Sequence, residues 1–152
     1  MSLKIDVIDA PSTPALFVRA TCEHKDIGPT FMDGLRKCFA VAEAAGATMA
    51  RGPFIRYTHW RESDCDMDGG MFTDRLVAGE GDVISEPIGG HKALFALHVG
   101  PYEALHDTHG ALHAHVDENG LELDSYCYEI YIDDPETTPP ESLRTEVYYP
   151  LK

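Results

Sequence analysis

Basic residues are scarce in this sequence: 12 Lys and Arg stand against 26 Asp and Glu, which leaves a formal net charge of −14. No stretch combines Lys or Arg with interleaved aromatic residues, so we do not expect direct nucleic-acid binding. The sequence has no run of about 18 apolar residues, the length that a membrane span needs, and no cationic segment followed by an apolar one begins it. These absences predict a soluble, cytoplasmic protein without membrane contacts.

Cysteine is also infrequent, and its spacing excludes the common zinc and disulfide motifs. The four cysteines lie far apart, form no C-x-x-C pair and are predicted to be reduced thiols. They are Cys22, Cys38, Cys65 and Cys127. The segment DCDMDGG, residues 64–70, imitates the start of a calcium loop, but its twelfth position is Arg75, where such a loop needs a bidentate Glu. We therefore expect a solvated acidic turn there, and no metal or cofactor.

Apolar residues follow strand and helix periods along the chain, and 152 residues with 43% hydrophobic residues fit one domain, 1–152. A helix is predicted from the Gly-Pro-Thr at 28–30 to Gly46, and a second within 100–120, which again begins at Gly-Pro and ends at Gly. The predicted strands are 3–9, 14–22, 52–60, 71–78, 92–99, 125–135 and 143–151. An acidic loop is predicted at 61–70 and linker turns at 79–81 and 89–90.

The order strand, helix, strand, strand occurs twice in this prediction. A spacing of 74 residues separates the helix ends Gly46 and Gly120, and also the strand residues Tyr57 and Tyr131. Equal offsets argue for a duplication. We therefore predict an α+β fold of duplicated βαββ units, one at about 1–78 and one at about 91–152. The units are expected to have pseudo-twofold symmetry and to form an antiparallel sheet with helices on one face and a central ligand groove.

Four motifs make the chain similar to a known family over nearly its whole length. They are GPYE at 100–103, E-x-Y at 129–131, DPETTPP at 134–140 and TEVYYP at 145–150. With these motifs the chain resembles the GyrI-like small-molecule-binding family, which supplies the effector-binding domains of AraC-type and MerR-type multidrug regulators. The resemblance implies a groove that holds flat, apolar and often cationic molecules. It also covers free-standing binders of toxic compounds and hydrolases that open cyclopropane-bearing genotoxins. Because no helix-turn-helix segment is visible, we expect a stand-alone member.

Glu129 is the central candidate, because it is an acid in the middle of the apolar run SYCYEIYIDDP. The strand period places Cys127, Glu129 and Tyr131 on one face. The resemblance implies that Glu129 faces the positive charge of a ligand, whose rings the aromatic residues would contact. If the protein is an enzyme, burial would raise the pKa of Glu129 and let it act as general acid or base with Tyr131. The alternative is an exposed Glu on a strand with one solvated face.

The first unit supplies a different set of groups to the predicted groove. Tyr57 is the repeat counterpart of Tyr131, whereas Ile55 stands where the second unit has Glu129, so the groove should be asymmetric. Trp60, the only Trp, lies three residues beyond Tyr57 and falls on the opposite face of an unbroken strand. It lines the groove only if the strand bends or ends there, and otherwise packs in the core.

Three further residues complete the predicted ligand-binding set. Met71 and Tyr148 lie on the closing strands of the two units and are candidates for groove walls, with core packing as the alternative. Tyr102 stands at the start of the second helix, with its hydroxyl directed toward the cleft. The predicted ligand-binding residues are Glu129, Tyr131, Tyr57, Trp60, Met71, Tyr102 and Tyr148.

Histidines crowd the second predicted helix, at His106, His109, His113 and His115. The first three fall within a narrow arc of a helix, since each residue turns it by about 100°. Three interpretations stay open: a metal site, a packing substitution for family aromatics, and a pH-dependent ligand affinity.

The sequence therefore supports three functions. The first is capture or sensing of hydrophobic, cationic or aromatic small molecules. The second is hydrolysis of cyclopropane-bearing genotoxins by Glu129 and Tyr131. The third, implied by the family's name, is a protein-interaction role with gyrase or a regulator as partner.

Overall fold

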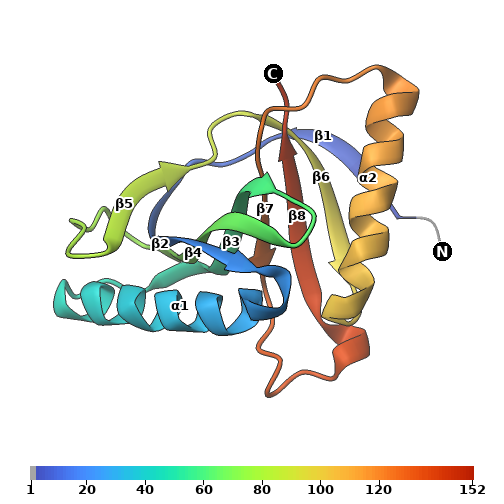
Figure 1. The fold of residues 1–152 in the computed structure, drawn as a ribbon. Helices are drawn as coiled ribbons and strands as arrows, with labels where there is room; N and C mark the ends of the chain where they lie inside the picture. Colours follow the sequence, from blue (N-terminus) through green and yellow to red (C-terminus); the bar gives the residue numbers. More distant parts are fainter. Residues whose placement is uncertain (1–2) are drawn as a thin grey trace.

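Eight antiparallel strands form one sheet in the computed structural model, which describes residues 3–152 (Figure 1). The strands are β1 (Ile5–Asp9), β2 (Thr13–Glu23), β3 (Met49–Trp60), β4 (Asp64–Thr73), β5 (Val83–Ile88), β6 (Lys92–Val99), β7 (Cys127–Tyr131) and β8 (Arg144–Pro150). The helices are α1 (Ile27–Ala44) and α2 (Leu105–Asn119), with 3₁₀ turns at 24–26, 102–104 and 140–142. The strand order is β1-β6-β8-β7-β3-β4-β2-β5. The predicted α+β class and antiparallel sheet are confirmed.

The two units predicted from the sequence meet at the centre of this sheet. Read outward from the centre, one half is β3-β4-β2 and the other is β7-β8-β6, which is the same order of equivalent strands. In the pairing of β3 with β7, Ile55 lies opposite Glu129. These two positions are repeat equivalents, so the register is consistent with a local twofold between them. Glu129 therefore lies at the centre of the sheet.

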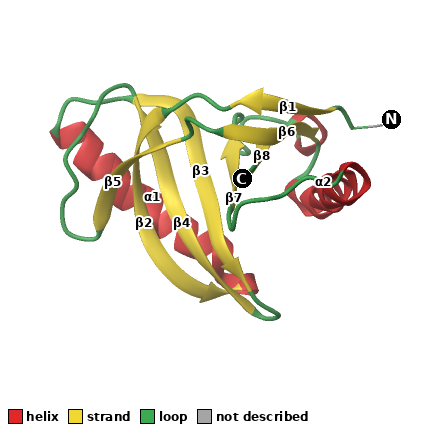
Figure 2. Ribbon diagram, turned by 90° about the horizontal axis from the view of Figure 1, so that it is seen from above, coloured by secondary structure: helices red, strands yellow, loops and turns green. Residues whose placement is uncertain are grey.

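Both helices pack on the same face of the sheet, each over its own half (Figure 2). The side chains of Leu35 and Cys38 from α1 pack on Leu16 of β2 in one buried cluster. In the other cluster, Leu112 of α2 packs on Leu94 of β6. Glu129 is on this face, where the strand alternation places it between the two clusters. The chain segment 3–152 contains no helix that is long and apolar enough to cross a membrane.

The other face of the curved sheet encloses a core of its own. It carries a third buried cluster, to which both halves contribute aromatic side chains. Phe17 and Phe54 come from one half, and the rings of Tyr128 and Tyr148 from the other half stack with their centroids 4.7 Å apart. The curved sheet thus encloses its core on one face and leaves room for a site on the helix face.

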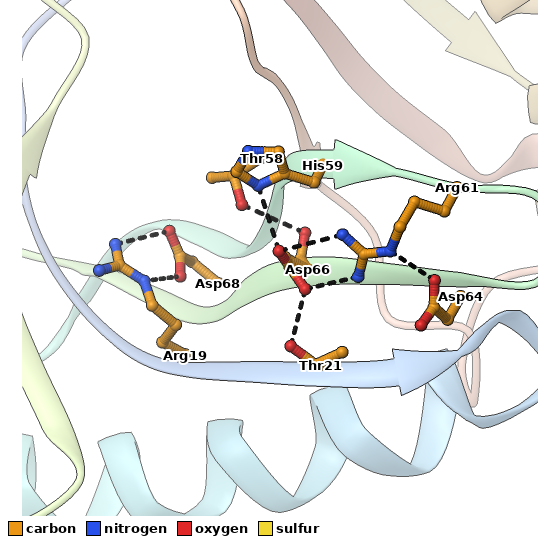
Figure 3. A network of polar contacts seen from close by, with 8 residues as sticks. All are labelled: Arg19, Thr21, Thr58, His59, Arg61, Asp64, Asp66 and Asp68. Atoms are coloured by element: carbon orange, nitrogen blue, oxygen red, sulfur yellow. Dashed lines mark hydrogen bonds and ion pairs between the residues drawn. The ribbon is translucent and has the colours of Figure 1, made fainter.

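Two sequence predictions about the middle of the chain are wrong. Residues 61–70 are not an acidic loop, because β4 begins at Asp64 and ends at Thr73, and the strand predicted at 71–78 therefore ends early. The strand β5 at Val83–Ile88 was not predicted. Residues 64–70, predicted as a solvated acidic turn, are part of this strand. Their alternate side chains Asp64, Asp66 and Asp68 bond arginines from β2 and the β3–β4 turn (Figure 3).

Glycine explains why β4 can be a central strand. A Cβ at Gly70 would lie 1.9 Å from the carbonyl oxygen of Leu16 on β2, so only Gly permits this approach. In the sequence, Gly69 and Gly70 suggested a turn. In the structure, the pair lies within β4, where Gly70 allows close contact with β2.

Candidate functional site

A pocket of about 720 Å³ opens between α2, the end of β3 and the start of β7. The carboxyl group of Glu129 is buried at its floor, and the residue is 5% exposed. The lining residues are Tyr57, Thr58, His59, Trp60, His106, His109, Gly110, His113, Leu123, Asp124, Ser125, Tyr126, Cys127, Glu129 and Tyr149. This volume is in the range that holds drug-sized ligands.

Each oxygen of the Glu129 carboxylate has one partner. The hydroxyl of Tyr131 donates to Oε1 at 2.5 Å, and Nε2 of His109 lies 2.5 Å from Oε2. No Lys or Arg belongs to the lining that residues 3–152 form. A buried carboxylate needs a compensating charge. The group in contact with Glu129 that can carry such a charge is His109.

His109 extends this contact into a chain of polar groups. Its Nδ1 lies 2.5 Å from the hydroxyl of Tyr149 on β8, and the same hydroxyl lies 3.3 Å from Nε2 of His113. α2 supplies both histidines from one side, because they are four positions apart and share a helix face. The chain joins Glu129 to the surface of α2 through three side chains.

Burial holds the other acids of the site in their neutral forms. It raises the pKa of Tyr131 well above its usual value, and the charge of Glu129 adds to this effect. Burial also raises the pKa of Tyr149, and it raises the pKa of the Cys127 thiol to about 12, again with a contribution from Glu129. At neutral pH these groups are hydrogen-bond donors without charge.

Trp60 and Tyr57 form an aromatic wall at the mouth of the pocket. Their rings meet edge to face with centroids 5.4 Å apart, and His24 stacks on Trp60 at 4.0 Å. The pairing of β3 with β4 shifts register between Tyr57 and His59, and this irregularity lets Trp60 share the pocket with Tyr57. Trp60 remains 61% exposed, so it is a rim residue.

The remaining predicted residues, Tyr131 among them, lie outside the pocket lining. Tyr131 reaches the site through its hydrogen bond to Glu129. The ring of Tyr102 packs edge to face on Tyr131 with centroids 5.7 Å apart, so it contacts the site only through that tyrosine. Met71 is buried in the cluster beneath α1. Tyr148 is buried on the opposite face of the sheet, where it stacks on Tyr128. For Met71 and Tyr148, core packing describes the observed positions.

Three of the four helix histidines line the pocket, namely His106, His109 and His113, whereas His115 does not. Within residues 3–152, no three His, Cys, Asp or Glu side chains are arranged to hold a metal ion. The sequence grouped the three histidines on one arc, but it did not show that His109 contacts Glu129. The sequence analysis also missed Tyr149 as a site residue. Its position two residues after Val147 on a predicted strand does place both side chains on the same face.

The strand order, the two helices on one face and the pocket beside α2 are those of a small-molecule-binding domain. The chain belongs to the family described as GyrI-like small molecule binding domain, whose sequence model matches residues 3–152. No curated protein matches the chain in sequence.

Solved structures share this fold at low sequence identity. The C-terminal domain of EcmrR superposes with a TM-score of 0.83 at 19% identity, covering 100% of this chain and 99% of that one. A hydrolase from Listeria innocua superposes with a TM-score of 0.70 at 17% identity, covering 98% of this chain and 92% of that one. The structure of SAV2435 bound to tetraphenylphosphonium superposes with a TM-score of 0.63 at 14% identity, covering 100% of this chain and 94% of that one. At these identities the similarity establishes the fold.

Proposed function

We propose that this protein binds hydrophobic, cationic or aromatic small molecules in the pocket at Glu129, for capture or sensing. One observation carries the proposal: Glu129 is a buried carboxylate at the floor of a ligand-sized pocket, and the lining that residues 3–152 give this pocket contains no Lys or Arg. A cation without hydrogen-bond donors suits this carboxylate, because Tyr131 and His109 already bond its two oxygens. Its charge would be compensated without loss of either bond.

The pocket walls support the same ligand class. Tyr57, Trp60 and Tyr149 present aromatic rings, which attract cations by about 0.5–2 kcal/mol each through their π faces. The formal net charge of −14 would also raise the local concentration of cations. The related structure of SAV2435 contains tetraphenylphosphonium, an apolar permanent cation, and so supplies a probe.

The test is titration with tetraphenylphosphonium, followed by the fluorescence of Trp60, the only Trp of the chain. We expect Glu129→Gln to weaken binding at least tenfold, about 1.4 kcal/mol, since it removes the buried charge and keeps the shape. Asp124→Asn is the matched control, because it removes the same charge from the exposed rim of the same pocket. That variant should bind within about twofold of wild type, as exposed charges contribute little.

Two results would contradict the proposal. One is equal affinity of wild type and Glu129→Gln, and the other is a loss in Asp124→Asn as large as that in Glu129→Gln. Circular dichroism and thermal unfolding of both variants establish that each is folded before its affinity is compared.

A second candidate function is hydrolysis, favoured by the hydrogen bond from Tyr131 to Glu129 and by the shared fold of the Listeria innocua hydrolase. Glu129 would take a proton from water while the water oxygen bonds to a cyclopropane carbon. The ring bond breaks, and its electrons take a proton from the Tyr131 hydroxyl. The proton on Glu129 then returns to the Tyr131 oxygen along their hydrogen bond, for a net addition of one water. Incubation with a cyclopropane-bearing electrophile should yield the ring-opened alcohol. Recovery of unchanged substrate would exclude this candidate.

A further inference from the structure

Glu129 and His109 form a pair of opposite ionisable groups at the pocket floor. The side chains are 6% and 24% exposed, and Oε2 of the acid lies 2.5 Å from Nε2 of the histidine. When the carboxyl group of Glu129 is ionised it only accepts hydrogen bonds, and Nε2 of His109 then carries a proton and donates it. The protonation of the other nitrogen, Nδ1, decides whether His109 is neutral or a cation.

The contact with Tyr149 permits both forms of His109. A neutral imidazole accepts the hydroxyl proton of Tyr149 at Nδ1, where the two atoms are 2.5 Å apart. An imidazolium instead donates from Nδ1 to the hydroxyl oxygen, and Tyr149 then donates to Nε2 of His113 at 3.3 Å. Rotation of one hydroxyl group therefore accommodates both charge states of His109, which exchanges its proton with solvent while no heavy atom moves.

The titratable groups that face this pair come from every surrounding element. They are His106 and His113 from α2, Cys127 and Tyr131 from β7, Tyr57 and His59 from β3, Tyr149 from β8, and Asp124 from the preceding loop. Burial raises the pKa of the facing tyrosines and of Cys127, so these groups stay neutral near pH 7. His59, His106, His113 and Asp124 are exposed. Among the groups in direct contact with Glu129, His109 is thus the one that can carry positive charge.

We propose that protonated His109 is the resident counter-charge of Glu129 and that the pocket exchanges this proton for a cationic ligand. The inference rests on the proposed function, since it concerns cations bound at Glu129. A ligand cation within a few ångströms of the imidazolium repels it, because like charges in a partly buried site are weakly screened. His109 then releases its Nδ1 proton and keeps its Nε2 bond to Glu129. The charge of the pocket is the same before and after binding.

Proton exchange makes His109 a determinant of specificity. Permanent cations such as phosphonium or quaternary ammonium compounds should bind more tightly as the pH rises through the range in which imidazoles titrate. A neutral ligand of the same shape releases no proton and gains nothing from the exchange. The pocket would thus select cations at neutral pH and release them in acid.

The experiment measures tetraphenylphosphonium binding by calorimetry from about pH 5.5 to about pH 8, in buffers of different ionisation enthalpy. For wild type we expect net proton release at the acid end and an affinity that rises by up to about tenfold per pH unit. His109→Gln keeps an N–H donor for Glu129 but cannot be charged. This variant should release no proton when it binds tetraphenylphosphonium, and its affinity should not change with pH. His115→Gln, on the same helix but outside the pocket lining, should retain the wild-type behaviour.

The outcomes separate this inference from the function on which it rests. Absence of binding at every pH, or binding that Glu129→Gln does not weaken, overturns both. Binding that depends on Glu129 but releases no proton and does not vary with pH overturns the exchange alone. Proton release that persists in His109→Gln also overturns it. If His109→Gln is unfolded by circular dichroism, imidazole nitrogen NMR of wild type decides instead, since His109 must change from imidazolium to neutral when tetraphenylphosphonium is added.

Discussion

At the scale of single residues, the site depends on how one carboxylate is held. Tyr131 and His109 each donate to one oxygen of Glu129, from the same strand and from α2. These donors fix the orientation of the acid and satisfy its acceptors. They have different consequences for the two candidate functions, because a counter-charge needs only the carboxylate, whereas a hydrolase also needs the proton of Tyr131.

Tyr131→Phe therefore distinguishes the two functions. It removes the hydroxyl that donates to Oε1 and leaves His109 in place. We expect tetraphenylphosphonium affinity to change by less than about threefold, since two charge-assisted contacts become one without loss of charge. Turnover of a cyclopropane substrate should fall about 100-fold, the usual contribution of general acid–base catalysis. Binding lost as completely as in Glu129→Gln would show that the ligand depends on the hydroxyl.

At the scale of elements, β4 shows how an acidic segment becomes a central strand. Asp68 is fully buried, and its two oxygens accept from Nε of Arg19 on β2 at 2.9 Å and Nε of Arg56 on β3 at 3.0 Å. The arginine side chains lie over the ring of Phe17, with guanidinium centres 5.0–5.8 Å from its centroid. The three strands are thus joined across their polar positions (Figure 3 shows Asp68 with Arg19).

Asp68→Asn should lower the free energy of unfolding by about 2–4 kcal/mol, because it leaves the largely buried guanidinium of Arg56 with only the exposed carboxylate of Glu86, 3.8 Å away. Asp66→Asn on the same strand is the control. Its carboxylate bonds Arg61, Thr21 and His59 at the surface, where solvent screens the charges, so its loss should cost clearly less stability. Urea unfolding of both variants gives the comparison. Equal losses would mean that burial of the ion pair is not what stabilises β4.

At the scale of the whole molecule, both faces of the sheet bury tyrosine. Burial raises the pKa of all seven tyrosines, which are Tyr57, Tyr102, Tyr126, Tyr128, Tyr131, Tyr148 and Tyr149. The pKa of Tyr148 rises to about 12, and that of the buried Cys38 thiol also to about 12. These residues belong to different clusters, so the effect concerns the fold and not one site.

These shifts predict that the protein is unstable in alkali. An unfolded tyrosine loses its proton near pH 10, whereas the folded one keeps it, so the native state binds more protons above that pH. The stabilisation is fully present below about pH 9–10 and is lost as the pH rises toward about 12. Tyrosinate absorbance should stay low until the protein unfolds, and then rise together with the loss of circular dichroism. A gradual rise near pH 10 in folded protein would contradict this.

Much of the architecture could be predicted because it follows from local sequence patterns. Strand β6 was predicted with its observed bounds, and α1 and β8 to within two residues, from periodicity and glycine stops. The offset of 74 residues indicated a duplication, and equivalent positions face each other where β3 pairs with β7. The failures at β4 and β5 share a cause: the local residues suggest turns, and both strands pair with β2, which is distant from them in sequence.

The sequence alone determined that Glu129 is an acid on the same strand face as Tyr131 and Cys127, because alternation is a property of the backbone. Only the tertiary structure decided that His109, twenty positions earlier on a helix, bonds that acid. It also decided that a register shift brings Trp60 to the pocket and that Met71 and Tyr148 pack in the core. Such outcomes depend on how a helix is rotated and how a sheet bends, and those follow from packing of the whole chain.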